Sequence, residues 1–182
     1  VVAALGRAEL PTVVHVRNRE DGYGAEDVRI FIDEVLPAAP DLPVQIAHMA
    51  GWGGYDGATD AALGAFIEAI RAGRLDASRV TFDLAAVVFQ PEAAGADTAL
   101  ARSVREANAR LAERIEELGA ERVVFATDWP SWPPGPEPAE GIAANLRLLE
   151  TALPLGDAAW RVILSNVNAV LGTDRPEDGP DR

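Results

Sequence analysis

The feature that most constrains the fold is a short apolar segment followed by an amphipathic segment, a pattern that occurs four times along the 182 residues. The apolar segments are rich in β-branched residues, as strands are. They show no clean polar–apolar alternation, which is typical of strands covered on both faces. The predicted strands are residues 11–16, 43–48, 79–84 and 121–127.

Apolar residues at helical spacing predict a helix after each strand. Thr59 fits the start of one helix and Gly73 its end, and Gly119 fits the end of another. This alternation of strand and helix predicts an α/β fold with a parallel sheet and right-handed crossovers. The predicted helices cover residues 26–36, 59–73, 97–118, 139–152 and 157–171.

Composition excludes several kinds of chemistry and partner. All 16 basic residues are arginine, there is no cysteine, and the formal net charge is −13. The chain therefore has no P-loop or Schiff-base lysine, no disulfide and no thiolate. The negative charge argues against nucleic acid and anionic membrane as partners. No apolar run approaches the roughly 20 residues of a membrane helix and no signal peptide is visible, so we expect a cytoplasmic protein with a small-molecule substrate.

Each predicted strand carries a polar residue near its C-terminal end, namely His15, His48, Asp83 and Asp128. The C-terminal ends of parallel strands meet at one rim, where α/β proteins gather their chemistry. Imidazole and carboxylate together suit zinc or another divalent transition ion, and a catalytic zinc takes three or more protein ligands. His15, His48 and Asp128 could supply a minimal set.

Structural roles are an open alternative for the same residues. Either histidine could hydrogen-bond to backbone at the end of a strand. Asp128 could be a turn residue before Trp129-Pro130, and Asp83 could pair with an arginine of a neighbouring element. Glu20 or Asp21, both in a predicted loop, could replace one of the metal ligands.

Five motifs identify a family at this point. They are Leu-Pro-Thr-Val-Val-His (10–15), Val-Gln-Ile-Ala-His-Met-Ala-Gly (44–51), Val-Thr-Phe-Asp-Leu (80–84), Val-Val-Phe-Ala-Thr-Asp-Trp-Pro (123–130) and Asn-Val-Asn-Ala-Val-Leu-Gly (166–172). In this order they resemble the amidohydrolase-related TIM-barrel family, which contains aminocarboxymuconate-semialdehyde decarboxylase and related lactonases and decarboxylases. The resemblance covers roughly residues 8 to 172.

The resemblance implies a (β/α)₈ barrel of which this chain supplies strands five to eight. His15 then matches a metal-binding histidine, and Asp128 matches an aspartate that contacts the metal and handles the proton of its water. His48 matches a histidine that acts near the substrate and the metal-bound water. Asp83 matches no essential position of the family.

Two departures from the family pattern limit what the chain can do alone. The family's first strand carries a His-x-His pair of metal ligands, which this sequence lacks, and Ala126 replaces a common glycine. A TIM barrel usually needs about 250 residues. We therefore expect residues 1–172 to be the C-terminal half of a barrel domain and residues 173–182 to be a flexible tail.

The implied activity is hydrolysis of a small carboxylate-bearing ester, lactone or amide by a metal-activated water, with zinc as the expected metal. Arg17 could clamp the carboxylate, and Trp52 and Trp129 could wall the pocket. The alternatives are non-oxidative decarboxylation, a non-catalytic half-barrel scaffold, or an unrelated four-stranded α/β domain with structural histidines. Open sheet edges also favour a homo-oligomer, which a sedimentation measurement detects.

We predict that the isolated chain binds zinc weakly, because two of the implied ligands are absent from it. Isothermal titration calorimetry measures this affinity directly. Tight one-to-one binding that is lost in both His15→Ala and Asp128→Ala would contradict the prediction.

Overall fold

The computed structural model describes residues 1–8, 10–17, 22–88, 99–128 and 138–171. Within them, four parallel strands form one sheet in the order β1-β2-β3-β4. Their bounds are β1 Thr12–Val14, β2 Val44–Ile46, β3 Val80–Asp83 and β4 Val123–Val124. The predicted parallel α/β fold is confirmed, although each strand is shorter than predicted because the chain leaves the sheet soon after its last paired residue.

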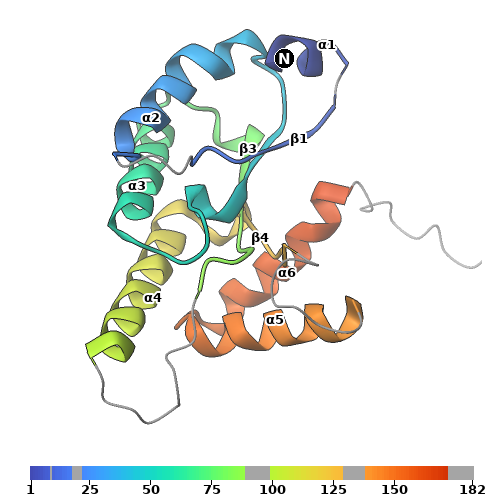
Figure 1. Ribbon diagram of the computed structural model, residues 1–182. Coiled ribbons are helices and arrows are strands. Elements are labelled where there is room, and N and C mark those ends of the chain that lie inside the picture. The colour runs from blue at the N-terminus through green and yellow to red at the C-terminus, as the bar shows by residue number, and fades with distance from the viewer. Residues whose placement is uncertain (9, 18–21, 89–98, 129–137, 172–182) are drawn as a thin grey trace, which may run out of the picture.

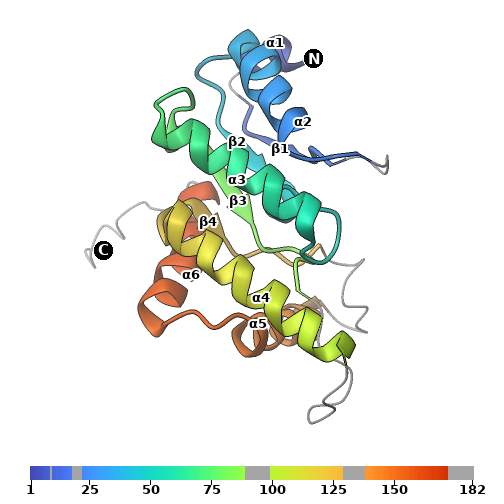
Figure 2. The same ribbon diagram turned by 90° about the vertical axis from the view of Figure 1, so that its left-hand side faces the viewer.

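Helices connect the strands in the predicted places. Figure 2 shows α2, α3 and α4 side by side in front of the sheet, while α5 and α6 lie beyond β4, at the far end from α1 (Figures 1 and 2). Because each helix returns the chain to the start of the next strand, all four strands point the same way. The helices are α1 Val2–Arg7, α2 Ala25–Ile30, α3 Gly57–Arg71, α4 Ala99–Leu118, α5 Pro138–Ala152 and α6 Asp157–Leu171.

The sequence does not predict α1, and several helix ends shift by one or two residues. Two boundaries differ in kind. Asp56, not Thr59, caps α3, because its carboxylate accepts the backbone N–H of Thr59 at 2.8 Å. The helix after β1 keeps α geometry only to Ile30 and continues as a π-helical turn, Phe31–Val35, and a 3₁₀ turn, Leu36–Ala38. Further 3₁₀ turns are η4 Ala77–Arg79 and η5 Ala120–Arg122, and η3 Ala47–Ala50 is a short turn that contains left-handed residues. The predicted tail, residues 173–182, lies outside the described residues.

The core lies between the sheet and α2, α3 and α4. Phe82 of β3 is fully buried, and its ring packs edge-on against Phe66 of α3 with the ring centres 5.3 Å apart. Ile46 and Val123 continue the same row across the sheet and are also fully buried. Removing these apolar side chains from water is the main force that holds helices to the sheet.

The opposite face of the sheet is more open than the sequence predicts. Its central row is Val13, Gln45 and Thr81, which pair across β1, β2 and β3. Val13 is 63% exposed and the other two are half-buried. The described residues therefore cover one face of the sheet fully and the other only in part.

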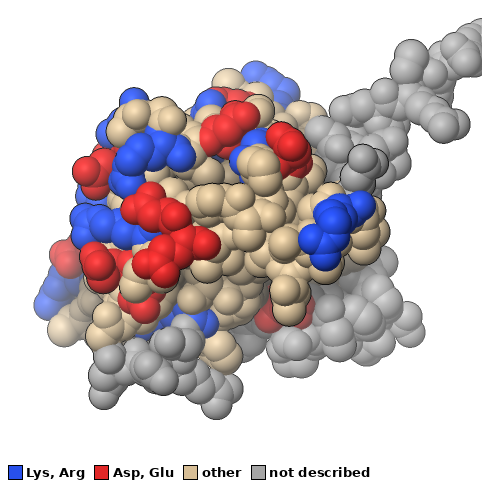
Figure 3. Space-filling view, turned by 90° about the horizontal axis from the view of Figure 1, so that it is seen from above, with Lys and Arg blue, Asp and Glu red and all other residues tan. Residues whose placement is uncertain are grey.

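Ion pairs hold α4 against α3 on the outer side of the molecule. Arg110 and Arg114 of α4 both donate to the Asp60 carboxylate of α3, at 3.0 and 2.8 Å, and Tyr55 donates to the same oxygen. In the view from above, acidic and basic side chains lie next to one another along one side, and uncharged residues fill the middle (Figure 3). No helix in the described ranges is long and apolar enough to cross a membrane.

We predict that Phe82→Ala lowers the free energy of unfolding by about 3–5 kcal/mol, because it empties a fully buried space between β3 and α3. Val13→Ala, on the open face of the same sheet, should change it by less than about 0.5 kcal/mol. Urea unfolding followed by circular dichroism measures both. Equal losses in the two variants would show that the open face is covered in solution.

Candidate functional site

The C-terminal ends of the strands bring the predicted histidines together. His15 directly follows β1 and His48 lies two residues after β2. Their ring centres are 5.0 Å apart, and the ring centre of Trp52 lies 4.6 Å from that of His15. His15 is exposed, His48 is half-buried and Trp52 is 44% exposed. Two imidazoles and an indole thus line one part of the rim.

Backbone strain gathers at this same rim. Five residues other than glycine have a positive φ among the described residues, and all five follow strands β2, β3 or β4. Each left-handed residue costs roughly 1–2 kcal/mol. Strain of this kind persists where the surrounding structure enforces it, commonly at functional sites. The five residues are His48, Met49, Ala50, Ala86 and Asp128.

Hydrogen bonds from the end of β3 hold His48 in its left-handed turn. The buried Asp83 carboxylate accepts the backbone N–H of His48 at 2.9 Å, that of Ala85 at 3.1 Å and Nε2–H of Gln45 at 2.8 Å. Nδ1 of His48 lies 2.8 Å from the carbonyl oxygen of Ala85. Because a carbonyl can only accept, Nδ1 carries the proton in the neutral ring.

Asp83 therefore has a structural role, but not the one that we proposed from the sequence. Its described hydrogen-bond donors are two backbone N–H groups and a glutamine amide, not an arginine. No local sequence pattern indicates Gln45 as its partner. The strand register could have indicated it. Gln45 pairs with Thr81, and Asp83 lies two residues after Thr81 on β3, so the side chains of Gln45 and Asp83 are on the same side of the sheet.

The environment of His15 favours its neutral form. Partial burial of the ring, much of which still faces solvent, and the neighbouring His48 lower the pKa of His15 below its usual value. The backbone of Arg17 and the charges of Asp128 and Asp83 oppose this shift. Asp128, exposed after β4, is thus close enough to act on His15 through its charge. A neutral imidazole is the form that binds a metal or accepts a proton.

Arg17 lies beside the histidines but is already paired. Its guanidinium makes two hydrogen bonds to the Asp56 carboxylate, at 2.9 and 2.8 Å, and a third to Thr59 Oγ1 at 2.8 Å. It also lies over the ring of Tyr23, whose hydroxyl donates to the Ala50 carbonyl. Arg17 thus links the segment after β1 to the start of α3 and to the left-handed turn. Its predicted role as a carboxylate clamp stays a prediction.

The predicted metal ligands fit a divalent ion in kind. Two imidazoles come together at the rim, and the carboxylate of Asp128 acts on one of them. The carbonyl bound to Nδ1 of His48 is the type of partner that orients a metal-binding histidine. No group of three potential ligands is gathered within the described ranges, so a metal here needs further donors. Trp129, Glu20 and Asp21 lie outside the described residues.

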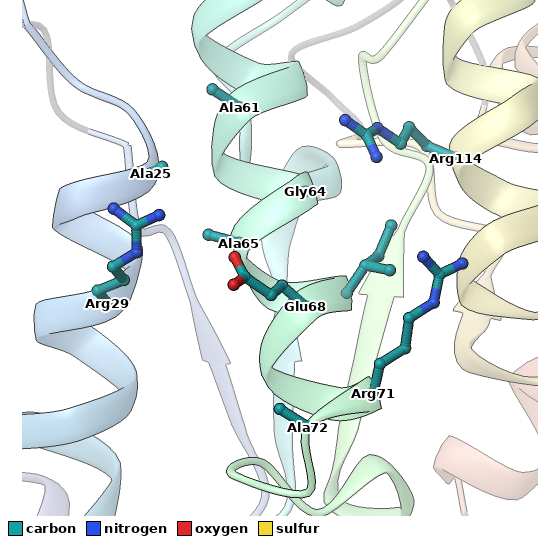
Figure 4. Close-up of a pocket in the computed structure, with 10 residues that line it drawn as sticks. Ala25, Arg29, Ala61, Gly64, Ala65, Glu68, Arg71, Ala72 and Arg114 are labelled. Atoms are coloured by element: carbon teal, nitrogen blue, oxygen red, sulfur yellow. The ribbon is translucent and has the colours of Figure 1, made fainter.

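A hollow of about 610 Å³ lies away from this rim, on the outer side of α3. Arginines from three helices, Arg29, Arg71 and Arg114, surround small residues of α3 there (Figure 4). Each of these arginines already pairs with a carboxylate of its own or a neighbouring helix. Nothing in the hollow adds to the chemistry of the histidines.

A parallel α/β fold with imidazoles and a carboxylate at the C-terminal rim is the general design of many hydrolases and lyases. The chain belongs to the amidohydrolase family, whose sequence profile matches residues 1–166. The resemblance inferred from the motifs is thereby confirmed. No curated protein matches the chain in sequence.

Solved structures share the fold at low sequence identity. A Pseudomonas putida protein provisionally named a 2-pyrone-4,6-dicarboxylic acid hydrolase matches 97% of this chain and 56% of its own, with 13% identity and a TM-score of 0.59. A zinc-bound amidohydrolase from Burkholderia multivorans matches 92% of this chain and 54% of its own, with 17% identity and a TM-score of 0.52.

A third structure, 5-carboxyvanillate decarboxylase from Sphingomonas paucimobilis, matches 93% of this chain and 51% of its own, with 18% identity and a TM-score of 0.50. The chain thus spans about half the length of the solved structures that it resembles. The fold class, parallel βα units equivalent to part of a TIM barrel, is confirmed.

We predict that Asp56→Ala lowers the free energy of unfolding by about 1 kcal/mol near neutral pH, through loss of the α3 cap and of the Arg17 pair. Burial alone would raise the pKa of Asp56, but hydrogen bonds from Arg17 and Thr59 outweigh it and hold the pKa at about 2.

Folding lowers the pKa of Asp56. The ionised carboxylate therefore stabilises the folded state at pH values above the ordinary aspartate pKa, and this stabilisation is lost as the pH falls toward 2. The difference between wild type and Asp56→Ala should therefore shrink in acid. Urea unfolding at a series of pH values measures it. A constant difference between pH 7 and pH 2.5 would contradict this assignment.

Proposed function

We propose that the protein hydrolyses a small carboxylate-bearing ester, lactone or amide with the help of a divalent metal, most simply zinc. The observation that carries the proposal is the meeting of His15 and His48, 5.0 Å between ring centres, at the rim where the strained backbone gathers. Membership of the amidohydrolase family supports it. So does the zinc bound in the Burkholderia multivorans relative.

The residues have separate roles in this proposal. His15 and Asp128 hold the metal, together with donors beyond those that the structure describes. When bound, a divalent metal lowers the pKa of water toward about 7. Asp128 accepts the proton of the attacking water, as an exposed carboxylate at the rim can. His48 faces the substrate and, with a proton on Nε2 as well as on Nδ1, donates a hydrogen bond from Nε2 to the substrate's carbonyl oxygen and stabilises the negative charge that develops there.

Substrate selection follows from Arg17 and Trp52. Arg17 places a positive charge two residues after His15, and a substrate carboxylate has to share its guanidinium with Asp56. Trp52 packs edge-on against His15 and offers an apolar surface for a planar ring. Cyclic esters that carry carboxylates, such as 2-pyrone-4,6-dicarboxylate, combine both features and head the list of compounds to assay.

The longest polypeptide that the gene encodes, supplied with zinc, should release protons from such lactones without releasing carbon dioxide. His48→Gln and Asp128→Asn should each lower kcat/KM about 10²–10⁴-fold, because each removes a group that handles charge in the transition state. Asp41→Asn is the matched control, since Asp41 is an exposed carboxylate in the turn before β2.

Carbon dioxide release from carboxylated phenols, with no lactone hydrolysis, would replace the proposal by decarboxylation. Both reactions are represented among the names of similar structures. Absence of both activities in the zinc-loaded, full-length protein would favour the scaffold role.

A further inference from the structure

Asp83 is the most deeply buried carboxylate at the rim and the proposed chemistry does not use it. Its residue is 3% exposed, and it lies at the last position of β3. Oδ1 accepts the backbone N–H groups of His48 and Ala85, and Oδ2 accepts the Gln45 amide. A carboxylate that leaves water is costly unless hydrogen bonds replace the lost solvent, and three donors do so here.

The His48 N–H that Asp83 accepts begins the left-handed turn. His48, Met49 and Ala50 have φ values of 54°, 51° and 67°, a conformation that side chains other than glycine seldom adopt in succession. The turn is closed by a 2.8 Å hydrogen bond from Gly51 N–H to the His48 carbonyl, and Met49 and Ala50 are fully buried. Asp83 thus holds the residue at which the backbone enters the left-handed conformation.

The segment Asp83–Ala85, which begins at the last residue of β3, also holds the ring of His48. Asp83 orients Ala85 by accepting its N–H, and the carbonyl of Ala85 faces Nδ1 of His48 at 2.8 Å. Backbone and ring of His48 are therefore both attached to Asp83–Ala85. A histidine with Nδ1–H donated to a fixed carbonyl keeps its lone pair on Nε2.

We propose that Asp83 is a positioning residue whose carboxylate holds the left-handed turn and so keeps the neutral ring of His48 in the Nδ1–H form. Nε2 is then the nitrogen that His48 presents to the substrate. The value of this arrangement for catalysis rests on the proposed function, but the form of the ring does not.

Nuclear magnetic resonance of the ¹⁵N-histidine-labelled chain tests the proposal directly, because the chain has only two histidines. Long-range ¹H–¹⁵N spectra of a neutral imidazole distinguish the Nδ1–H from the Nε2–H form. His15→Gln assigns the two sets of signals. Wild-type His48 should be in the Nδ1–H form, and an Nε2–H ring in the wild type overturns the proposal without any further variant.

Asp83→Ala should lower the ratio of the Nδ1–H to the Nε2–H form of His48 about tenfold, while the His15 signals keep their ring form. Asp83→Asn keeps an oxygen that can accept both backbone N–H groups, so most of the Nδ1–H form should remain. Asp76→Ala is the matched control: Asp76 also accepts a backbone N–H, that of Ser78, but before β3 at the opposite end of the sheet.

A folded Asp83→Ala protein with an unchanged His48 ring overturns the proposal. If Asp83→Ala does not fold, the wild type and Asp83→Asn decide the question. Loss of the Nδ1–H form of His48 in a folded Asp83→Asn protein would overturn the proposed route through the turn, because it would show that the charge of the carboxylate, not the backbone N–H groups that it accepts, determines the form of the ring. None of these measurements involves turnover. Failure of the proposed hydrolysis therefore leaves this result standing, and the reverse is also true.

Discussion

Parallel hydrogen bonding between β2 and β3 is the constraint on which the rest of the site depends. The register pairs Ile46 with Phe82, so both strands end at nearly the same level. The residues just beyond them, His48 on one strand and Ala85 on the other, must then lie opposite each other. The contact between imidazole and carbonyl is a direct result of that register. Burial of Phe82 against Phe66 keeps the register in place from the other side of the sheet.

The molecule separates the region that stabilises it from the region that is strained. The face toward α2, α3 and α4 holds fully buried apolar side chains in ordinary backbone conformations. The rim holds the left-handed residues, the exposed carboxylate of Asp128 and a pair of close imidazoles. Strain of several kcal/mol at the rim is tolerable only because the sheet and helices beneath it are well packed.

Much of this arrangement could be predicted from the sequence. The hydrophobic pattern alone predicts the four strands and the helices that follow them, because the 3.6-residue and strand patterns are clear and the glycines mark helix ends. The positions of His15, His48 and Asp128 at strand ends then follow from parallel topology. The prediction places the cap of α3 at Thr59 instead of Asp56 because both are capping residue types, and only the backbone shows which one is extended.

Other parts could not be predicted from local patterns. Nothing in Ala-His-Met-Ala indicates three left-handed residues in succession, since methionine and alanine seldom adopt that conformation. The turn is imposed by contacts from Asp83 and Tyr23, which are distant in the sequence. Likewise Arg17 looks like a free cation in the sequence, whereas its partner Asp56 lies 39 residues further on. Long-range contacts of this kind decide side-chain roles that spacing leaves open.

The short link between His48 and α3 has a mechanical consequence. A Cβ on Gly51 would come within 3.0 Å of the Thr59 side chain, so the loop after the left-handed turn lies directly against the first turn of α3. The imidazole of His48 is therefore stiffly coupled to a fifteen-residue helix and to the end of β3. Among the described residues, His15 is exposed at the edge of the sheet and is tied to α3 only indirectly, through Arg17 two residues further on. Any adjustment of the site to ligands of different size should therefore be absorbed on the His15 side, with His48 as the fixed reference point.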